Sequence, residues 1–127
     1  MDKAALVSIE LAKGCDILRM FDDAGLNVKV ALWAYLSEYE DWRLIVASRK
    51  FDEVGMFEAY GLIHKALKNG GLTVAQFPIV MILGMKTPFI KSLRRRYGKT
   101  NSVQGIRVGN QLFGDRFVED GLVYRVS

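Results

Sequence analysis

Cysteine and proline are scarce in this chain of 127 residues, which contains one cysteine and two prolines. The single cysteine, Cys15, cannot form an intrachain disulfide, so a reducing compartment fits the sequence better than secretion. We therefore expect a cytoplasmic protein. With so few prolines and no stretch rich in serine and glycine, the sequence contains no recognisable linker, and we predict one α+β domain over residues 1–127.

Long hydrophobic runs are missing as well. The longest one, from Phe77 to Met85, contains Pro78 and is far shorter than the about 20 residues of a membrane-spanning helix. The first ten residues already include Asp2 and Glu10, so no apolar region of a signal peptide develops there. The sequence predicts no membrane partner, and the residues near 78–84 are expected to form a strand buried on both faces.

The spacing of apolar residues predicts three helices. They cover residues 2–24, 55–69 and 88–97, and each is followed by a glycine that can close its last turn. Thr87 and Pro88 stand at the cap and first-turn positions of the third helix. Apolar residues of the first helix occupy a wider arc than one buried face needs, which indicates cover by more of the domain or by a second copy.

Strand patterns fill most of the remaining sequence. They cover 28–36, 42–48, 78–84 and the tail 105–126, which has a tight turn at 113–116 and a bend or bulge at 119–121. The order α-β-β-α-β-α-β-β favours an α+β fold with a single mixed or mostly antiparallel sheet of about five strands and three helices. Both faces of the hairpin formed by 28–36 and 42–48 are apolar, which again favours a homo-oligomer.

Acidic residues are absent from one segment in particular. Residues 86–107 hold seven of the 18 basic residues and none of the 14 acidic ones, although the net charge of the whole chain is only +4. Such a segment attracts polyanions, which release counterions when they bind. Helical spacing places Lys91, Arg94 and Arg95 on the outer side of the third helix with Arg96 beside them. The candidate binding residues for an anion or nucleic acid are Lys91, Arg94, Arg95, Arg96, Lys99 and Arg107.

A structural role explains the same charges without a ligand. Arginines in the last turn of a helix interact favourably with its dipole, and long cationic side chains shield apolar surface. Acidic residues from 1–85 can also fold onto the segment and neutralise it. Aromatic residues of the first hairpin, Trp33, Tyr35, Tyr39 and Trp42, are expected to pack across the hairpin rather than to stack on bases.

Catalytic and metal-binding patterns are weak. The lone histidine, His64, lies at the edge of an apolar helical stripe, and no clear basic neighbour of Cys15 indicates a nucleophilic role. The acidic residues of 38–41 and the pair Asp52-Glu53 match no metal-ligand spacing. We assign no catalytic residue, metal or cofactor.

Several segments together resemble a small family of bacterial α+β domains with no assigned activity. They are 31–36 (ALWAYL), 42–48 (WRLIVAS), 105–108 (GIRV) and 123–125 (VYR), and the resemblance extends over most of the chain. It implies a stand-alone bacterial domain and gives no residue a role.

Our sequence-based hypothesis is a non-enzymatic cytoplasmic module that self-associates and presents the basic segment 86–107 to nucleic acid or another polyanion. One alternative is a protein-interaction or accessory domain whose basic residues are already paired with acidic ones. The other is a metal-dependent nuclease or phosphotransfer enzyme, which would need some of Asp41, Asp52, Glu53, His64 and Arg107 to converge in a cleft.

Overall fold

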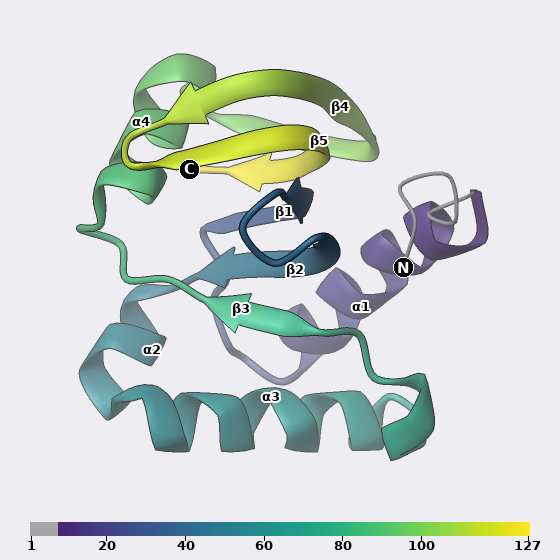
Figure 1. Cartoon of the computed structure of the whole chain (residues 1–127). Coiled ribbons are helices and arrows are strands. Elements are labelled where there is room, and N and C mark those ends of the chain that lie inside the picture. The colour runs from purple at the N-terminus through teal and green to yellow at the C-terminus, as the bar shows by residue number, and fades with distance from the viewer. Residues whose placement is uncertain (1–7) are drawn as a thin grey trace.

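Residues 8–127 are described by a computed structural model, with side chains described for 14–102 and 105–127. The helices of this part are α1 (Ser8–Asp23), α2 (Arg49–Val54), α3 (Met56–Asn69), the short 3-10 helix η2 (Val74–Gln76) and α4 (Pro88–Tyr97). The strands are β1 (Val30–Leu36), β2 (Asp41–Ala47), β3 (Val80–Ile82), β4 (Thr100–Phe113) and β5 (Arg116–Val126). The predicted α+β class is confirmed (Figure 1).

The strands form one five-stranded mixed sheet in the order β3-β2-β1-β5-β4. Antiparallel pairing joins β1 to β2, β1 to β5, and β4 to β5, whereas β3 runs parallel to β2. The tail strand β5 thus inserts beside β1 and makes β1 the central strand. The predicted mixed sheet is therefore correct.

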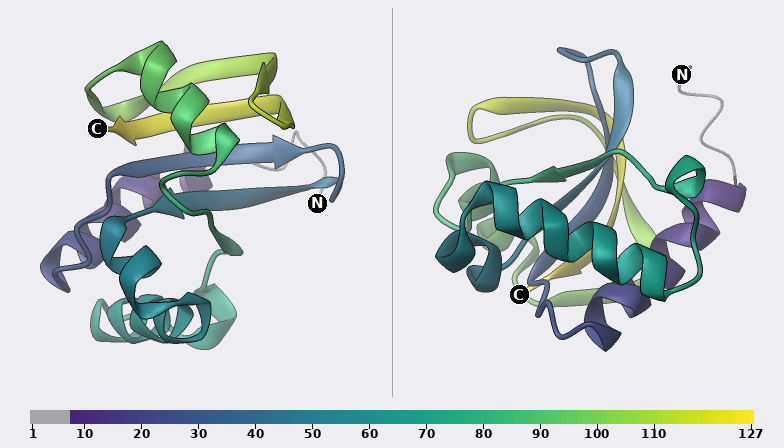
Figure 2. Two further views of the ribbon diagram at one scale, coloured as in Figure 1. Left: turned by 90° about the vertical axis from the view of Figure 1, so that its left-hand side faces the viewer. Right: turned by 90° about the horizontal axis from the view of Figure 1, so that it is seen from below.

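Both faces of the sheet are covered by helices of the same chain. On one face, α1 and α3 bury Phe21, Ile63 and Leu67 in a core that includes Trp33 of β1. On the other face, α4 contributes Phe89, Ile90 and Leu93 to a second core. Figure 2 shows α4 and α1 on opposite sides of the strands. The apolar character of both hairpin faces therefore needs no second copy, and this reason for expecting self-association no longer holds.

Three local predictions need correction. Helix α2 was missed: the buried Ser48 caps it by accepting a hydrogen bond from the backbone N–H of Lys50, and its hydroxyl donates to the carbonyl of Leu26. The strand expected near 78–84 is shorter than predicted, because only β3 (Val80–Ile82) forms there. It is not buried on both faces: Val80 and Met81 are half-buried because β3 lies at the edge of the sheet. Strand β4 begins at Thr100, whereas the strand pattern of the tail was expected to begin at residue 105.

Other boundaries agree with the sequence. Helix α1 ends at Asp23, and Gly25 adopts a left-handed φ of 71° after it, whereas residues 2–7 of the predicted first helix lie outside the described residues. The tight turn after Phe113 and the irregularity near Glu119 are also present. Tyr35 of β1 pairs with Asp120 and Leu36 with Val118, so Glu119 is the extra residue of a β-bulge.

The turn between β4 and β5 generates a prediction about stability. Gly114 has a φ of 61°, and a Cβ atom there would lie 2.6 Å from the carbonyl oxygen of Pro88. We expect Gly114→Ala to lower the free energy of unfolding by about 1–3 kcal/mol, because left-handed backbone strain and a collision with α4 add together. Thermal or denaturant unfolding followed by circular dichroism measures this change.

Gly61→Ala is the matched control. Gly61 lies inside α3 with nothing within 4 Å of the added Cβ, so alanine should raise stability by about 0.5–1 kcal/mol. Equal stabilities for the two variants would contradict the packing of this turn against α4.

Candidate functional site

Helix α4 carries most of the basic segment, and its orientation is set by its apolar residues. Phe89, Ile90 and Leu93 are completely buried in the core between α4 and the sheet. The opposite side exposes Lys91, Arg95 and Arg96. Lys91 and Arg95 are thus exposed as predicted, with Arg96 beside them, whereas Arg94, which was also predicted on the outer side, is half-buried.

Both ends of α4 lie where the sequence indicates. Thr87 occupies the N-cap position and Pro88 the first turn, but the hydroxyl of Thr87 donates to the carbonyl of Gly84 at 2.7 Å. The expected side-chain cap is therefore not formed. Gly98 follows the helix with a φ of 60°, and its N–H donates to the carbonyl of Arg94.

Two of the predicted site residues are engaged within the chain. Arg94 is half-buried, and its Nε donates to the backbone carbonyl of Ser127 at 2.9 Å. Arg107 donates from Nε and Nη2 to the two carboxylate oxygens of Asp120, at 2.9 and 2.7 Å. Asp120 therefore neutralises Arg107, and Arg107 belongs at most to the margin of an anion-binding surface.

The other four predicted residues are exposed and unneutralised. Lys91, Arg95, Arg96 and Lys99 have no carboxylate partner within the described part of the chain, and we call them the basic surface. Lys86 is also exposed but precedes α4.

Ion pairs elsewhere engage other acidic residues. Arg116 pairs with Glu38, and Arg125 forms two hydrogen bonds of 2.8 Å with Asp22. The hydrogen bonds that Arg125 donates to the carboxylate of Asp22 raise the pKa of Arg125 above its ordinary value. These two carboxylates therefore pair with arginines outside the basic segment 86–107.

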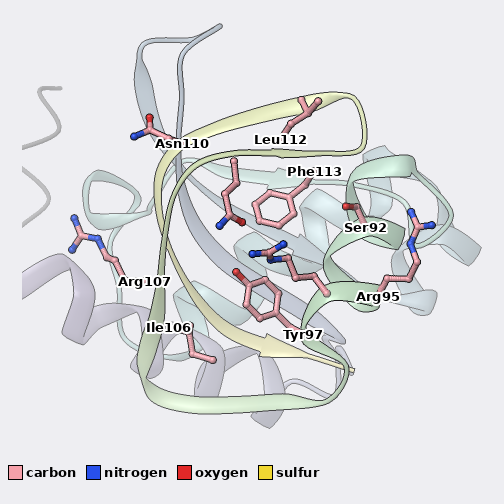
Figure 3. Close-up of a pocket in the computed structure, with 10 residues that line it drawn as sticks. Ser92, Arg95, Tyr97, Ile106, Arg107, Asn110, Leu112 and Phe113 are labelled. Carbon is pink, nitrogen blue, oxygen red and sulfur yellow. The ribbon is translucent and has the colours of Figure 1, made fainter.

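Two of the hollows that border the basic surface lie next to α4. The larger, which we call the α4–β4 groove, has a volume of about 1150 Å³ and lies between α4 and the β4–β5 hairpin (Figure 3). It is lined by Ser92, Arg95, Arg96, Tyr97, Ile106, Arg107, Asn110, Gln111, Leu112 and Phe113. The smaller, about 550 Å³, is lined by Lys91, Arg94, Arg95, Gly98, Lys99 and Ser127. Arg95 borders both hollows.

Figure 3 shows how the labelled side chains lie around the groove. The ring of Tyr97 lies between α4 and the arch of β4, with Phe113 beside it. Arg95 projects from the outer side of α4, and Arg107 projects from β4 away from the helix. A ligand in the groove would therefore meet the ring of Tyr97 between α4 and β4.

The sequence analysis missed Gln111, which also lines the groove. Its side-chain Oε1 atom is buried and has no hydrogen-bond partner. Gln111 and Phe113 are two residues apart on β4 and both line the groove. No motif in the sequence marks Gln111, because its place in the groove depends on how β4 packs beside α4.

The residues considered for catalysis are placed apart from this region. The exposed His64 on α3 has its ring 5.5 Å from that of Phe77. Asp52 on α2 accepts a hydrogen bond from the backbone N–H of Met85, and Asp41 at the start of β2 accepts one from the N–H of Trp42. Among the residues that the structure describes, no three His, Cys, Asp or Glu side chains are grouped so that they could hold a metal ion.

The aromatic residues of the first hairpin pack as expected. Tyr35 and Trp42 lie opposite each other on β1 and β2 with ring centroids 5.7 Å apart in an edge arrangement. Trp33 and Trp42 are each only 5% exposed. Tyr39 is exposed, but the guanidinium of Arg43 lies over its ring at 4.1 Å. These rings contribute to packing and leave no flat aromatic surface for bases.

Comparisons of the chain with protein-family models, with curated proteins and with solved structures give no match. In the part of the chain that is described, none of the helices has both the length and the apolar character needed to cross a bilayer. The functional argument therefore rests on the chemistry of the basic surface and the groove.

Proposed function

We propose that this protein is a non-enzymatic module that binds nucleic acid, as a polyanion, through Lys91, Arg95, Arg96 and Lys99. The observation that carries the proposal is that these four cations are exposed side by side along α4 and the turn after it, while no described carboxylate pairs with them. Arg94 and Arg107 lie at the margin, because each already has a partner within the chain.

The physical basis is counterion release. Each phosphate that a lysine or arginine neutralises frees part of a condensed counterion, so affinity falls steeply as salt rises. Helix α4 holds Lys91 and Arg95 one turn apart, and Lys99 follows directly after Gly98. A phosphate backbone passing along the helix can therefore contact successive cations without any rearrangement of the core.

The double substitution Arg95→Gln with Arg96→Gln tests this surface. We expect about tenfold weaker binding to a labelled single strand at moderate salt, and a log–log salt slope lower in magnitude by roughly one to two. Fluorescence anisotropy over a salt series measures both quantities.

Two control variants separate this effect from net charge. Lys65→Gln and Lys68→Gln each remove an exposed cation from α3, in the other helical layer. Both should leave the affinity within about twofold of the wild type. Equal losses for all variants, or binding insensitive to salt, would contradict the proposed surface.

We also propose that the protein self-associates, through the start of α3 rather than through the first hairpin. Phe57 is 97% exposed and its neighbour Met56 is 51% exposed, which is unusual for large apolar side chains. A second copy packed on this face in a symmetric dimer would bury both residues and leave the α4–β4 groove open.

Sedimentation at micromolar concentration tests the dimer. The wild type should sediment as a dimer and Phe57→Ser as a monomer, because the substitution removes the largest exposed apolar side chain of the face. Val74→Ser, which changes another exposed apolar residue on η2, should remain dimeric. A monomeric wild type would refute self-association and leave the nucleic-acid proposal intact.

A further inference from the structure

The floor of the α4–β4 groove is an aromatic surface with a rigid support. Tyr97 is half-buried, and its ring centroid lies 6.3 Å from that of Phe113. Phe113 is itself only 1% exposed and contacts Phe89 edge-on at 6.0 Å. The ring of Tyr97 is therefore held in place while part of it faces the groove (Figure 3). A fixed, partly exposed aromatic ring is what a planar ligand stacks against.

A second feature of the groove is a hydrogen-bond acceptor that has no donor among the residues described. The Oε1 atom of Gln111 is buried without a partner, and a buried acceptor left unpaired costs free energy. The Gln111 side chain as a whole is half-buried and lines the groove, so its amide lies at the groove wall. An inorganic anion has no N–H group to satisfy this oxygen, whereas the edge of a nucleobase does.

We infer that the α4–β4 groove seats one unpaired base of a single-stranded nucleic acid. The face of the base stacks on Tyr97, its edge bonds to the amide of Gln111, and the neighbouring phosphates contact Arg95 and Arg96. This inference rests on the proposed function and specifies its ligand as single-stranded. In a duplex, base faces are stacked and Watson–Crick edges are paired, so a duplex offers phosphates to the arginines but no base to Tyr97.

Wild-type protein and three probes of equal length test the inference. The probes are a single strand of about ten nucleotides, an otherwise identical strand in which every base is removed to leave abasic sugars, and a duplex. All three present phosphates, but only the first presents free bases. We expect it to bind about tenfold more tightly than the abasic strand, because base stacking on an aromatic side chain adds to the phosphate contacts.

Variants of the groove locate the base. Tyr97→Leu and Gln111→Met should each reduce the preference for the base-containing strand over the abasic strand by about fivefold or more, whereas Tyr97→Phe should retain it because the ring remains. Tyr39→Leu, at an exposed tyrosine in the β1–β2 loop, is the matched control and should change nothing. If Tyr97→Leu fails to fold, the wild-type comparison of the base-containing and abasic strands still decides the question.

The outcomes separate this inference from the proposed function. Equal, salt-dependent binding of all three probes would overturn the base-binding groove and leave the polyanion surface standing. Absence of binding to every probe would overturn both. Equally tight binding of a polyglutamate peptide would contradict the assignment of nucleic acid as the ligand, since that peptide offers charge without planar rings.

Discussion

The contact of Phe113 with Phe89 and Tyr97 fixes how α4 lies against the β4–β5 hairpin. Phe113 ends β4 and is buried between the helix and the sheet, with ring centroids 6.0 Å from Phe89 and 6.3 Å from Tyr97. Because this aromatic contact and the buried Ile90 and Leu93 determine which side of α4 faces inward, the arginines on the other side must face solvent. The basic surface is thus a consequence of core packing.

Ion pairs elsewhere in the molecule help to leave the basic surface without carboxylate partners in the described part of the chain. The described ion pairs join Arg125 to Asp22, Arg116 to Glu38 and Arg107 to Asp120, and all of them involve at least partly exposed groups. Exposed ion pairs contribute only about 0–1 kcal/mol to stability. Their larger consequence here is electrostatic, because they engage carboxylates away from Lys91, Arg95, Arg96 and Lys99. Lys91 and Arg95 are about one turn, or roughly 5–6 Å, apart along α4, which is within a Debye length of about 8–10 Å at physiological salt.

Local features of the sequence predicted much of the fold and part of the site. Thr87-Pro88 and Gly98 delimit α4 correctly, and the apolar spacing within it identifies the exposed cations. Helix α2 was missed because Ser48 continues the strand pattern of β2, although it serves as the helix cap. Long-range contacts could not be foreseen. Arg107 meets Asp120 only because β4 and β5 pair in one particular register, and Arg94 meets Ser127 only because β5 returns to the end of α4.

The α4–β4 groove also could not be predicted from the sequence. Gln111 lines it because β4 packs beside α4 in this fold, and a single sequence does not give that placement. The apolar first hairpin likewise indicated a second copy, whereas the structure covers its two faces with α1 and α3 on one side and α4 on the other. Composition and periodicity thus identify buried and basic residues, while the partner of each residue depends on strand register and chain topology.

The central claim is that the basic surface has no carboxylate partners within the residues that the structure describes. Its most direct test is the NMR spectrum of the arginine Nε–Hε groups during titration with inorganic polyphosphate. The account predicts that the signals of Arg95 and Arg96 shift progressively, while those of Arg107, Arg116 and Arg125 change little because carboxylates already hold them. Uniform shifts of all arginine signals, or shifts confined to the paired arginines, would contradict it.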